Sequence, residues 1–169
     1  MALHACGYRS ISTDDAKEIV LQINKMTESV NEAAMFLAHL FHESGGFQHR
    51  SESNGPKKSY APYYGRGYIQ ITYYYNYRDA SKVIYENEQV LLDFPDKVSE
   101  TVYMSMRVSV WFWRTKVRPA GGPSSNDFYR TTEVINGELE PPGSFLANRR
   151  YGLYVDVADV LGVTNKAKS

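Results

Sequence analysis

Residues 36–47 read Phe-Leu-Ala-His-Leu-Phe-His-Glu-Ser-Gly-Gly-Phe, and this stretch decides both the fold and the chemistry that we expect. Its apolar side chains, together with Ala33 just before the stretch, recur at the spacing of one broad helical face. They are Ala33, Phe36, Leu37, Leu40 and Phe41. A helix that opens at Ser29 or Asn31 and ends near Gly45-Gly46 is therefore predicted to pack against a core.

Glu43 stands at the C-terminal end of this apolar helix, beside the glycine pair. Apolar neighbours disfavour a carboxylate and the helix C-terminus carries partial negative charge, so both should raise the pKa of Glu43. A carboxyl group that keeps its proton near neutral pH can act as a general acid. The alternative is a solvated helix-terminal glutamate before a glycine stop.

Glu52 follows in a polar loop, where we expect it to stay ionised. A protonated carboxyl and an ionised carboxylate that face each other across a cleft are the arrangement for hydrolysis of a sugar bond. The alternative for Glu52 is an ordinary solvated surface residue.

A tyrosine-rich stretch over residues 63–77 contains Gly-Arg-Gly followed by alternating apolar and polar side chains. Residues 68–75 predict a short strand, with Ile69 and Ile71 turned inward and Gln70 and Thr72 on the opposite face. That polar face would form the floor of a cleft. The alternative is an ordinary tyrosine-rich hairpin.

The remaining pattern is helical and contains no internal repeat. We expect helices opening at Ser12 or Thr13, over 79–88, from Ser99 through the core motif Trp111-Phe112-Trp113, over 132–135, and from Ser144 to Leu161 before Gly162. Four or five helices with minimal strand predict a mainly α domain. We expect one catalytic domain over 1–169, with loose ends at 1–10 and 164–169.

Composition excludes several classes of protein and site. Lys plus Arg and Asp plus Glu are 19 each, and this zero net charge argues against nucleic acid and against a polybasic membrane anchor. No apolar run reaches the length of a membrane span. Cys6 is the single cysteine, so neither an intrachain disulfide nor a thiolate metal site is expected. His39, His42 and His49 lack a metal-binding spacing, and we expect structural histidines and no metal.

Five motifs in order resemble the family 19 glycoside hydrolases, which are chitinases of plants and bacteria with related phage endolysins. The motifs are residues 36–47, residues 63–77, Trp111 to Trp113, Ile135 to Glu140, and Arg150 to Tyr154 with Leu161 to Val163. The resemblance implies a lysozyme-like α+β domain with a small β element beside the catalytic cleft. It also implies hydrolysis without a cofactor.

The resemblance assigns Glu43 as general acid, Glu52 as general base and Thr72 as a hydroxyl that holds the attacking water. Inversion at the anomeric carbon implies carboxyl groups roughly 6.5–9.5 Å apart. Glu140 and Arg150 match an ion pair that tunes the acid. The positions that match substrate contacts are His42, Tyr64, Gln70, Tyr75, Asn76, Asn136 and Arg150.

The chain departs from the family pattern where Tyr68 replaces a proline and Glu138 replaces a glycine, and its segment between the two glutamates is short. These departures imply a compact domain with a short, open cleft. The expected substrate is chitin, cleaved within the polymer; the alternatives are a peptidoglycan hydrolase and an inactive chitin-binding protein. We expect a monomer that acts outside the cell or at the cell wall, although residues 1–9 hold no signal-peptide pattern.

Overall fold

The computed structural model describes all 169 residues, and its regular structure is helical. The α-helices are α1 (Ala2–Ala5), α2 (Thr13–Met26), α3 (Val30–Ser44), α4 (Tyr74–Tyr85), α5 (Val90–Asp93), α6 (Lys97–Glu100), α7 (Val102–Phe112), α8 (Phe128–Asn136) and α9 (Phe145–Leu161). Short 3₁₀ turns are η1 (Gly55–Lys57) and η3 (Arg118–Ala120), and η2 (Trp113–Val117) is a π-helical turn. The mainly α prediction is confirmed.

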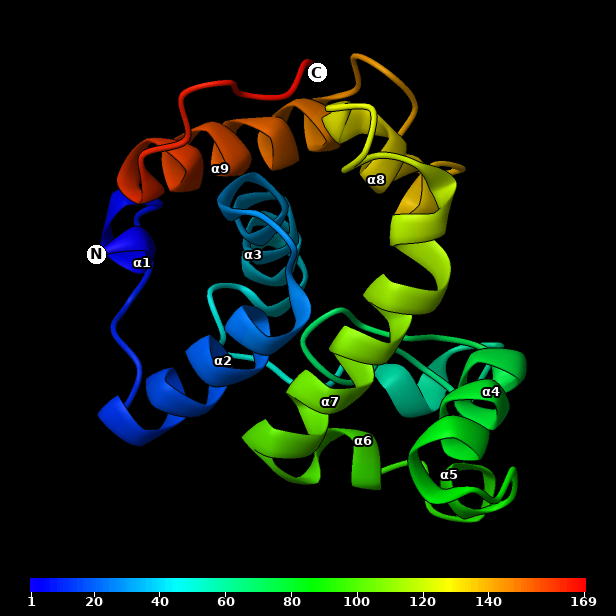
Figure 1. Ribbon diagram of the computed structural model, residues 1–169. Helices are drawn as coiled ribbons and strands as arrows, with labels where there is room; N and C mark the ends of the chain where they lie inside the picture. The colour runs from blue at the N-terminus through cyan, green and yellow to red at the C-terminus, as the bar shows by residue number, and fades with distance from the viewer.

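Helix α3 lies at the centre of the molecule, crossing behind α9 (Figure 1). Its side chains from Ala34 to Phe41 are buried almost without interruption, so it is packed on nearly all sides. Helix α2 packs against α7. Helices α4 and α5 pack against each other, and α4 also contacts α7 (Figure 1). Glu43 is therefore carried by the most enclosed helix of the fold.

Local capping signals explain where the long helices begin and end. The Ser29 hydroxyl accepts a hydrogen bond from the Glu32 amide at the start of α3, and Gly45 ends the helix with left-handed backbone. Ser12 caps α2 and Ser144 caps α9 in the same way, and α9 stops at left-handed Gly162. The three predicted helices that open at these serines are confirmed.

Three other helix boundaries differ from the expectation. Thr101, not Ser99, caps α7, because the chain first forms the separate turn α6. Helix α4 begins at Tyr74 rather than at 79, and α8 begins at Phe128 because the Asp127 side chain accepts from the Arg130 amide. Tyr74 begins its helix without any side-chain cap, so no local signal marks it.

The strand predicted over 68–75 is wrong. Gln70 has φ +57° and its amide donates to Gly67 O, so the chain reverses there in a tight turn. Arg66 and Ile71 exchange two backbone hydrogen bonds, which form an isolated bridge and not a ladder. A hydroxyl distant in sequence, Ser109 Oγ, accepts from the Ile69 amide at 3.1 Å and fixes the turn against α7. The small β element of the expected α+β fold is not shown as a sheet; the segment has only two isolated antiparallel bridges, Ser51 with Arg66 and Arg66 with Ile71.

Both chain ends, expected to be loose, are packed in the structure. Helix α1 contacts α9 (Figure 1). At the other end, Ala167 is buried and its amide donates to the Tyr154 hydroxyl, while Lys168 O accepts from the Phe128 amide. None of the helices combines the length and the apolar character that a membrane crossing requires.

Candidate active site

A cavity of about 370 Å³ brings together most of the side chains singled out in the sequence. Its walls come from the end of α3, the loop that follows, the turn at 67–72, the start of α4 and the end of α8. The predicted site residues among its lining are Glu43, Glu52, Gln70, Thr72, Tyr75, Asn76 and Asn136. Residues far apart in sequence thus share one concave surface, as a binding site requires.

On the acid side of the cavity, Arg150 binds two carboxylates at once. Its Nη2 donates to Glu43 Oε1 at 2.5 Å, and its Nε and Nη2 each donate to Glu140 at 2.7 Å. Arg150 is only 1% exposed, so these are buried charge-assisted contacts. Asn136 Nδ2 also donates to Glu140 Oε1 at 2.7 Å, which joins the end of α8 to the same cluster.

The pKa of Glu43 is raised, because burial penalises its charged form more than Arg150 favours it, and nearby Glu140 adds to the rise. The pKa of Glu140 moves the other way: burial would raise it, but hydrogen bonds from Arg150 and Asn136 lower it. Arg150 therefore pairs with the ionised Glu140. Glu43 Oε1 takes the Arg150 N–H, which leaves Oε2 to carry the proton.

His39 is a neutral partner of Arg150. Thr131 Oγ1 donates to Phe128 O, so it must accept from His39 Nε2, 2.7 Å away. The other ring nitrogen, Nδ1, then accepts from Arg150 Nη1 at 3.3 Å. Burial and the Arg150 charge hold the pKa of His39 well below its usual range, so the ring stays uncharged. No sequence pattern indicated these contacts among Thr131, His39 and Arg150.

Glu52, which lines the same cavity, is held by three donors. The Tyr60 hydroxyl donates to Oε1 at 2.8 Å, Lys58 Nζ lies 3.2 Å from the same oxygen, and the Gly65 amide donates to Oε2 at 3.1 Å. Partial burial would raise the pKa of Glu52, but these donors outweigh it and lower the pKa. The two glutamates of the cavity therefore have pKa values shifted in opposite directions.

The polar floor of the cavity is internally hydrogen-bonded through its donors. Gln70 Nε2 donates to Gly67 O, Thr72 Oγ1 donates to Gln70 O, and Asn76 Nδ2 donates to Thr72 O. These bonds fix the side chains and leave their oxygen acceptors for a ligand. Hydroxyl and amide N–H groups of an N-acetylated sugar are suitable donors.

Three predicted substrate contacts lie outside the cavity lining. The Tyr64 ring covers the Arg66 guanidinium at 3.7 Å. His42 Nε2 lies 3.9 Å from Glu140 Oε1, and its Nδ1 is buried without a hydrogen-bond partner. Arg150 touches Glu43 and Glu140 from behind the cavity. No group of three metal-binding side chains converges here or elsewhere.

Sequence reasoning missed Tyr60 and Lys58 as partners of Glu52, because the loop folds back on itself through the turn at 55–57. It also missed the apolar rim from α8, where Val134, Ile135 and Leu139 line the cavity. The helical spacing of Val134 and Ile135 was a usable signal for that rim.

Comparisons with known proteins identify relatives of this chain. A family model described as class I chitinase matches residues 36–131. Endochitinase EP3 of Arabidopsis thaliana is 31% identical over 157 residues, covering 84% of this chain and 55% of that protein. Chitinase 4 of Oryza sativa subsp. japonica is 34% identical over 154 residues, covering 81% of this chain and 51% of that protein. The chain thus spans about half the length of these curated relatives.

Solved structures share the fold. The crystal structure of a family GH19, class IV chitinase from Zea mays is 28% identical with a TM-score of 0.71, covering 94% of this chain and 85% of that one. Chitinase C from Streptomyces griseus HUT6037 has a TM-score of 0.78 at 22% identity, covering 99% of this chain and 77% of that one. The second likeness concerns the fold alone.

Proposed function

Because the chain belongs to the class I chitinase family of glycoside hydrolases, we propose that it cleaves β-1,4-linked N-acetylglucosamine polymers internally, with inversion at the anomeric carbon. One observation carries this proposal. Two glutamates line one cavity, and their pKa values are shifted in opposite directions. Pairs of carboxyl groups separated in this way are suited to act as acid and base.

In this mechanism Glu43 is the general acid. Its Oε2 hands the proton to the glycosidic oxygen as the bond to the anomeric carbon breaks. The carboxylate left behind is buried, and Arg150 stabilises it through the contact that already exists at Oε1. The guanidinium thus contributes more after proton transfer than before it, which is the condition for stabilising the transition state.

Glu52 is the general base in the same proposal. Its lowered pKa keeps it ionised, and it takes a proton from water that attacks the opposite face of the sugar. Thr72 and Gln70 line the same cavity as the two glutamates, and the Thr72 hydroxyl oxygen can accept a hydrogen bond from that water. The proton lost by Glu43 and the proton gained by Glu52 balance the hydrolysis.

The rim of the cavity supports a sugar polymer as substrate. The Tyr73 and Tyr75 rings stack 5.7 Å apart at 16°, and both rings are about half exposed. Such flat surfaces suit the apolar faces of pyranose rings. Since this polymer occurs outside cells, we place the site of action there as part of the proposal.

Glu43→Gln tests the proposal with a chitin hexasaccharide as substrate. We expect kcat to fall by a factor of about 10²–10⁴, because the amide has no proton to donate, while binding and thermal stability persist. Glu133→Gln, on the exposed face of α8, is the matched control and should keep full activity. Product NMR on the wild type should show the α-anomer first. Undiminished turnover in the Glu43 variant, or an initial β-anomer, would contradict the mechanism.

A further inference from the structure

A second cavity, of about 500 Å³, lies apart from the residues of the proposed mechanism. Its walls come from α2, from the loop after α3, from the turn at 67–70 and from the α6–α7 region. Its lining residues are Asp15, Phe47, Gln48, His49, Arg50, Ser51, Tyr68, Ser99 and Val102. None of them lines the catalytic cavity.

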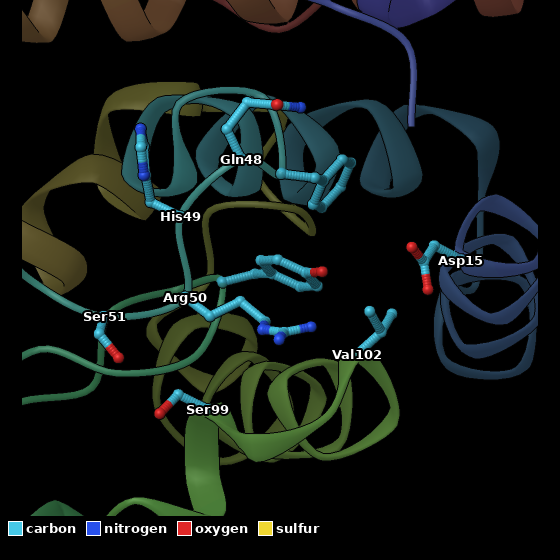
Figure 2. Close-up of a pocket in the computed structure, with 9 residues that line it drawn as sticks. Asp15, Gln48, His49, Arg50, Ser51, Ser99 and Val102 are labelled. Carbon is cyan, nitrogen blue, oxygen red and sulfur yellow. The ribbon is translucent and has the colours of Figure 1, made fainter. Parts of the chain in front are cut away.

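Two side chains of opposite charge face each other across this pocket. Figure 2 shows Arg50 reaching from the loop toward Val102, with the Asp15 carboxylate on the opposite wall. Both residues are half-buried, and neither takes part in any ion pair of the structure. His49 and Ser51 lie at the margin, away from this gap (Figure 2).

Tyr68 lines the same pocket, and the charges of Arg50 and Asp15 both act on its hydroxyl. The residue is 2% exposed, and its ring packs edge-on against Phe47 with centroids 4.8 Å apart. Burial raises the pKa of Tyr68, Arg50 opposes the rise and Asp15 adds to it, so the hydroxyl stays protonated within reach of both charges.

The arrangement selects a ligand by its charge. A simple anion would meet the repulsion of Asp15, and a simple cation would meet that of Arg50. A neutral sugar would remove both charged side chains from water without pairing them, and this desolvation is unfavourable. A molecule with a carboxylate at one end and an ammonium at the other satisfies both walls.

We propose that this pocket binds an amino acid or short peptide with both charges. Its carboxylate pairs with Arg50 and accepts from the Tyr68 hydroxyl, and its ammonium pairs with Asp15. The Phe47 ring and the Val102 side chain provide an apolar wall for a small side chain between the two charged ends. This proposal is independent of the glycosidase mechanism, since it uses none of the catalytic side chains.

The test is titration of the intact protein with alanyl-alanine, followed by backbone amide NMR. We expect shifts centred on Arg50, Tyr68 and Asp15, and affinity reduced at least tenfold in Arg50→Met and in Asp15→Asn, because each loses a charge-assisted contact. Lys17→Gln, an exposed charge change on α2, should bind like the wild type. Hydrolysis of chitin oligosaccharides should stay unchanged in all three variants.

Blocked peptides make the result decisive. N-acetyl-alanyl-alanine lacks the ammonium and alanyl-alanine amide lacks the carboxylate, so each should bind at least tenfold more weakly. Nα-acetyl-lysyl-alanine carries its ammonium on the side chain instead of at the N-terminus. If this probe binds and alanyl-alanine does not, the ligand of the pocket is a peptide that is covalently attached through its N-terminus. Equal binding of the blocked peptides, or shifts that avoid the pocket, would overturn the proposal. Tyr68→Phe, which keeps the ring, should weaken binding without lowering thermal stability.

Discussion

At the scale of single residues, the acid side of the cleft depends on the guanidinium of Arg150. It contacts two carboxylates and a neutral imidazole while almost wholly removed from solvent. Without it, Glu43 and Glu140 would face each other as buried acids with no counter-charge, which is strongly unfavourable. We therefore propose that Arg150 acts through Glu43 as a positioning residue, while its sequence-based assignment to substrate contact stays a prediction.

Tyr60 has the corresponding role for Glu52, and Tyr60→Phe tests it. Burial and the Glu52 carboxylate raise the pKa of Tyr60 to about 12, so it remains a hydrogen-bond donor. Loss of this donor should raise the pKa of Glu52 and move the acidic limb of the kcat/KM profile to higher pH, with an activity loss of about tenfold or less on that limb.

Tyr74→Phe is the matched control for this measurement. Tyr74 is half exposed, lies in the tyrosine-rich stretch over residues 63–77 and forms no side-chain hydrogen bond to Glu52. Its pH profile should follow the wild type. If the acidic limb of Tyr60→Phe stays where the wild type has it, the hydroxyl does not tune the base.

At the level of secondary-structure elements, the left-handed turn after α3 sets the direction of the loop that carries Glu52. Gly45 and Gly46 both have positive φ, and a Cβ on Gly46 would lie 2.4 Å from the Tyr8 ring. The N-terminal segment is thus pressed against the end of the helix that bears the acid. No side chain fits there without displacing Tyr8 or the turn.

Gly46→Ala should consequently destabilise the protein by more than ~2 kcal/mol, since steric overlap adds to the backbone cost. Gly143→Ala provides the comparison, because Gly143 has the same backbone sign at φ +77° but open space around its Cβ. That variant should lose only about 1–2 kcal/mol. Urea unfolding measures both, and equal losses would show that contact with Tyr8 adds nothing.

Features fixed by interactions between residues close in sequence could be predicted, and features fixed by distant residues could not. Helices opened by Ser12, Ser29 and Ser144 were predictable, because a cap and its amide lie within three residues. The turn at 67–72 was not, because the Ser109 hydroxyl that holds it lies 40 residues away. Sequence also indicated Glu43 and Glu52, but the donors around them come together only through the tertiary fold.

At the scale of the whole molecule, buried neutral histidines link stability to pH. Burial and Arg150 lower the pKa of His42 to about 4, from an ordinary value of 6.5, and they also hold the pKa of His39 well below its ordinary value. Between these values the unfolded chain binds protons that the folded protein does not. Stability is therefore greatest above pH 6.5 and falls as the pH drops toward 4.

For His42 alone the loss over that range should reach about 3 kcal/mol in the free energy of unfolding. Urea unfolding at pH 7.5, 6 and 5 measures the slope. His42→Gln should make the slope less steep, because only His39 then contributes, whereas His49→Gln, at an exposed position, should leave it as in the wild type. An unfolding free energy that is constant from pH 7.5 to 5 would contradict the buried neutral state.

The two carboxyl groups of the cleft lie in segments that differ strongly in how far they are buried. Glu43 ends a helix packed on nearly all sides, whereas Glu52 begins an exposed excursion that returns at Tyr63. Arg66 closes the base of that excursion by donating to Pro62 O and the Tyr77 hydroxyl. During evolutionary divergence, length changes in residues 53–61 would therefore alter the donors Lys58 and Tyr60 that hold Glu52, while the proposed proton donor stays where the interior has placed it.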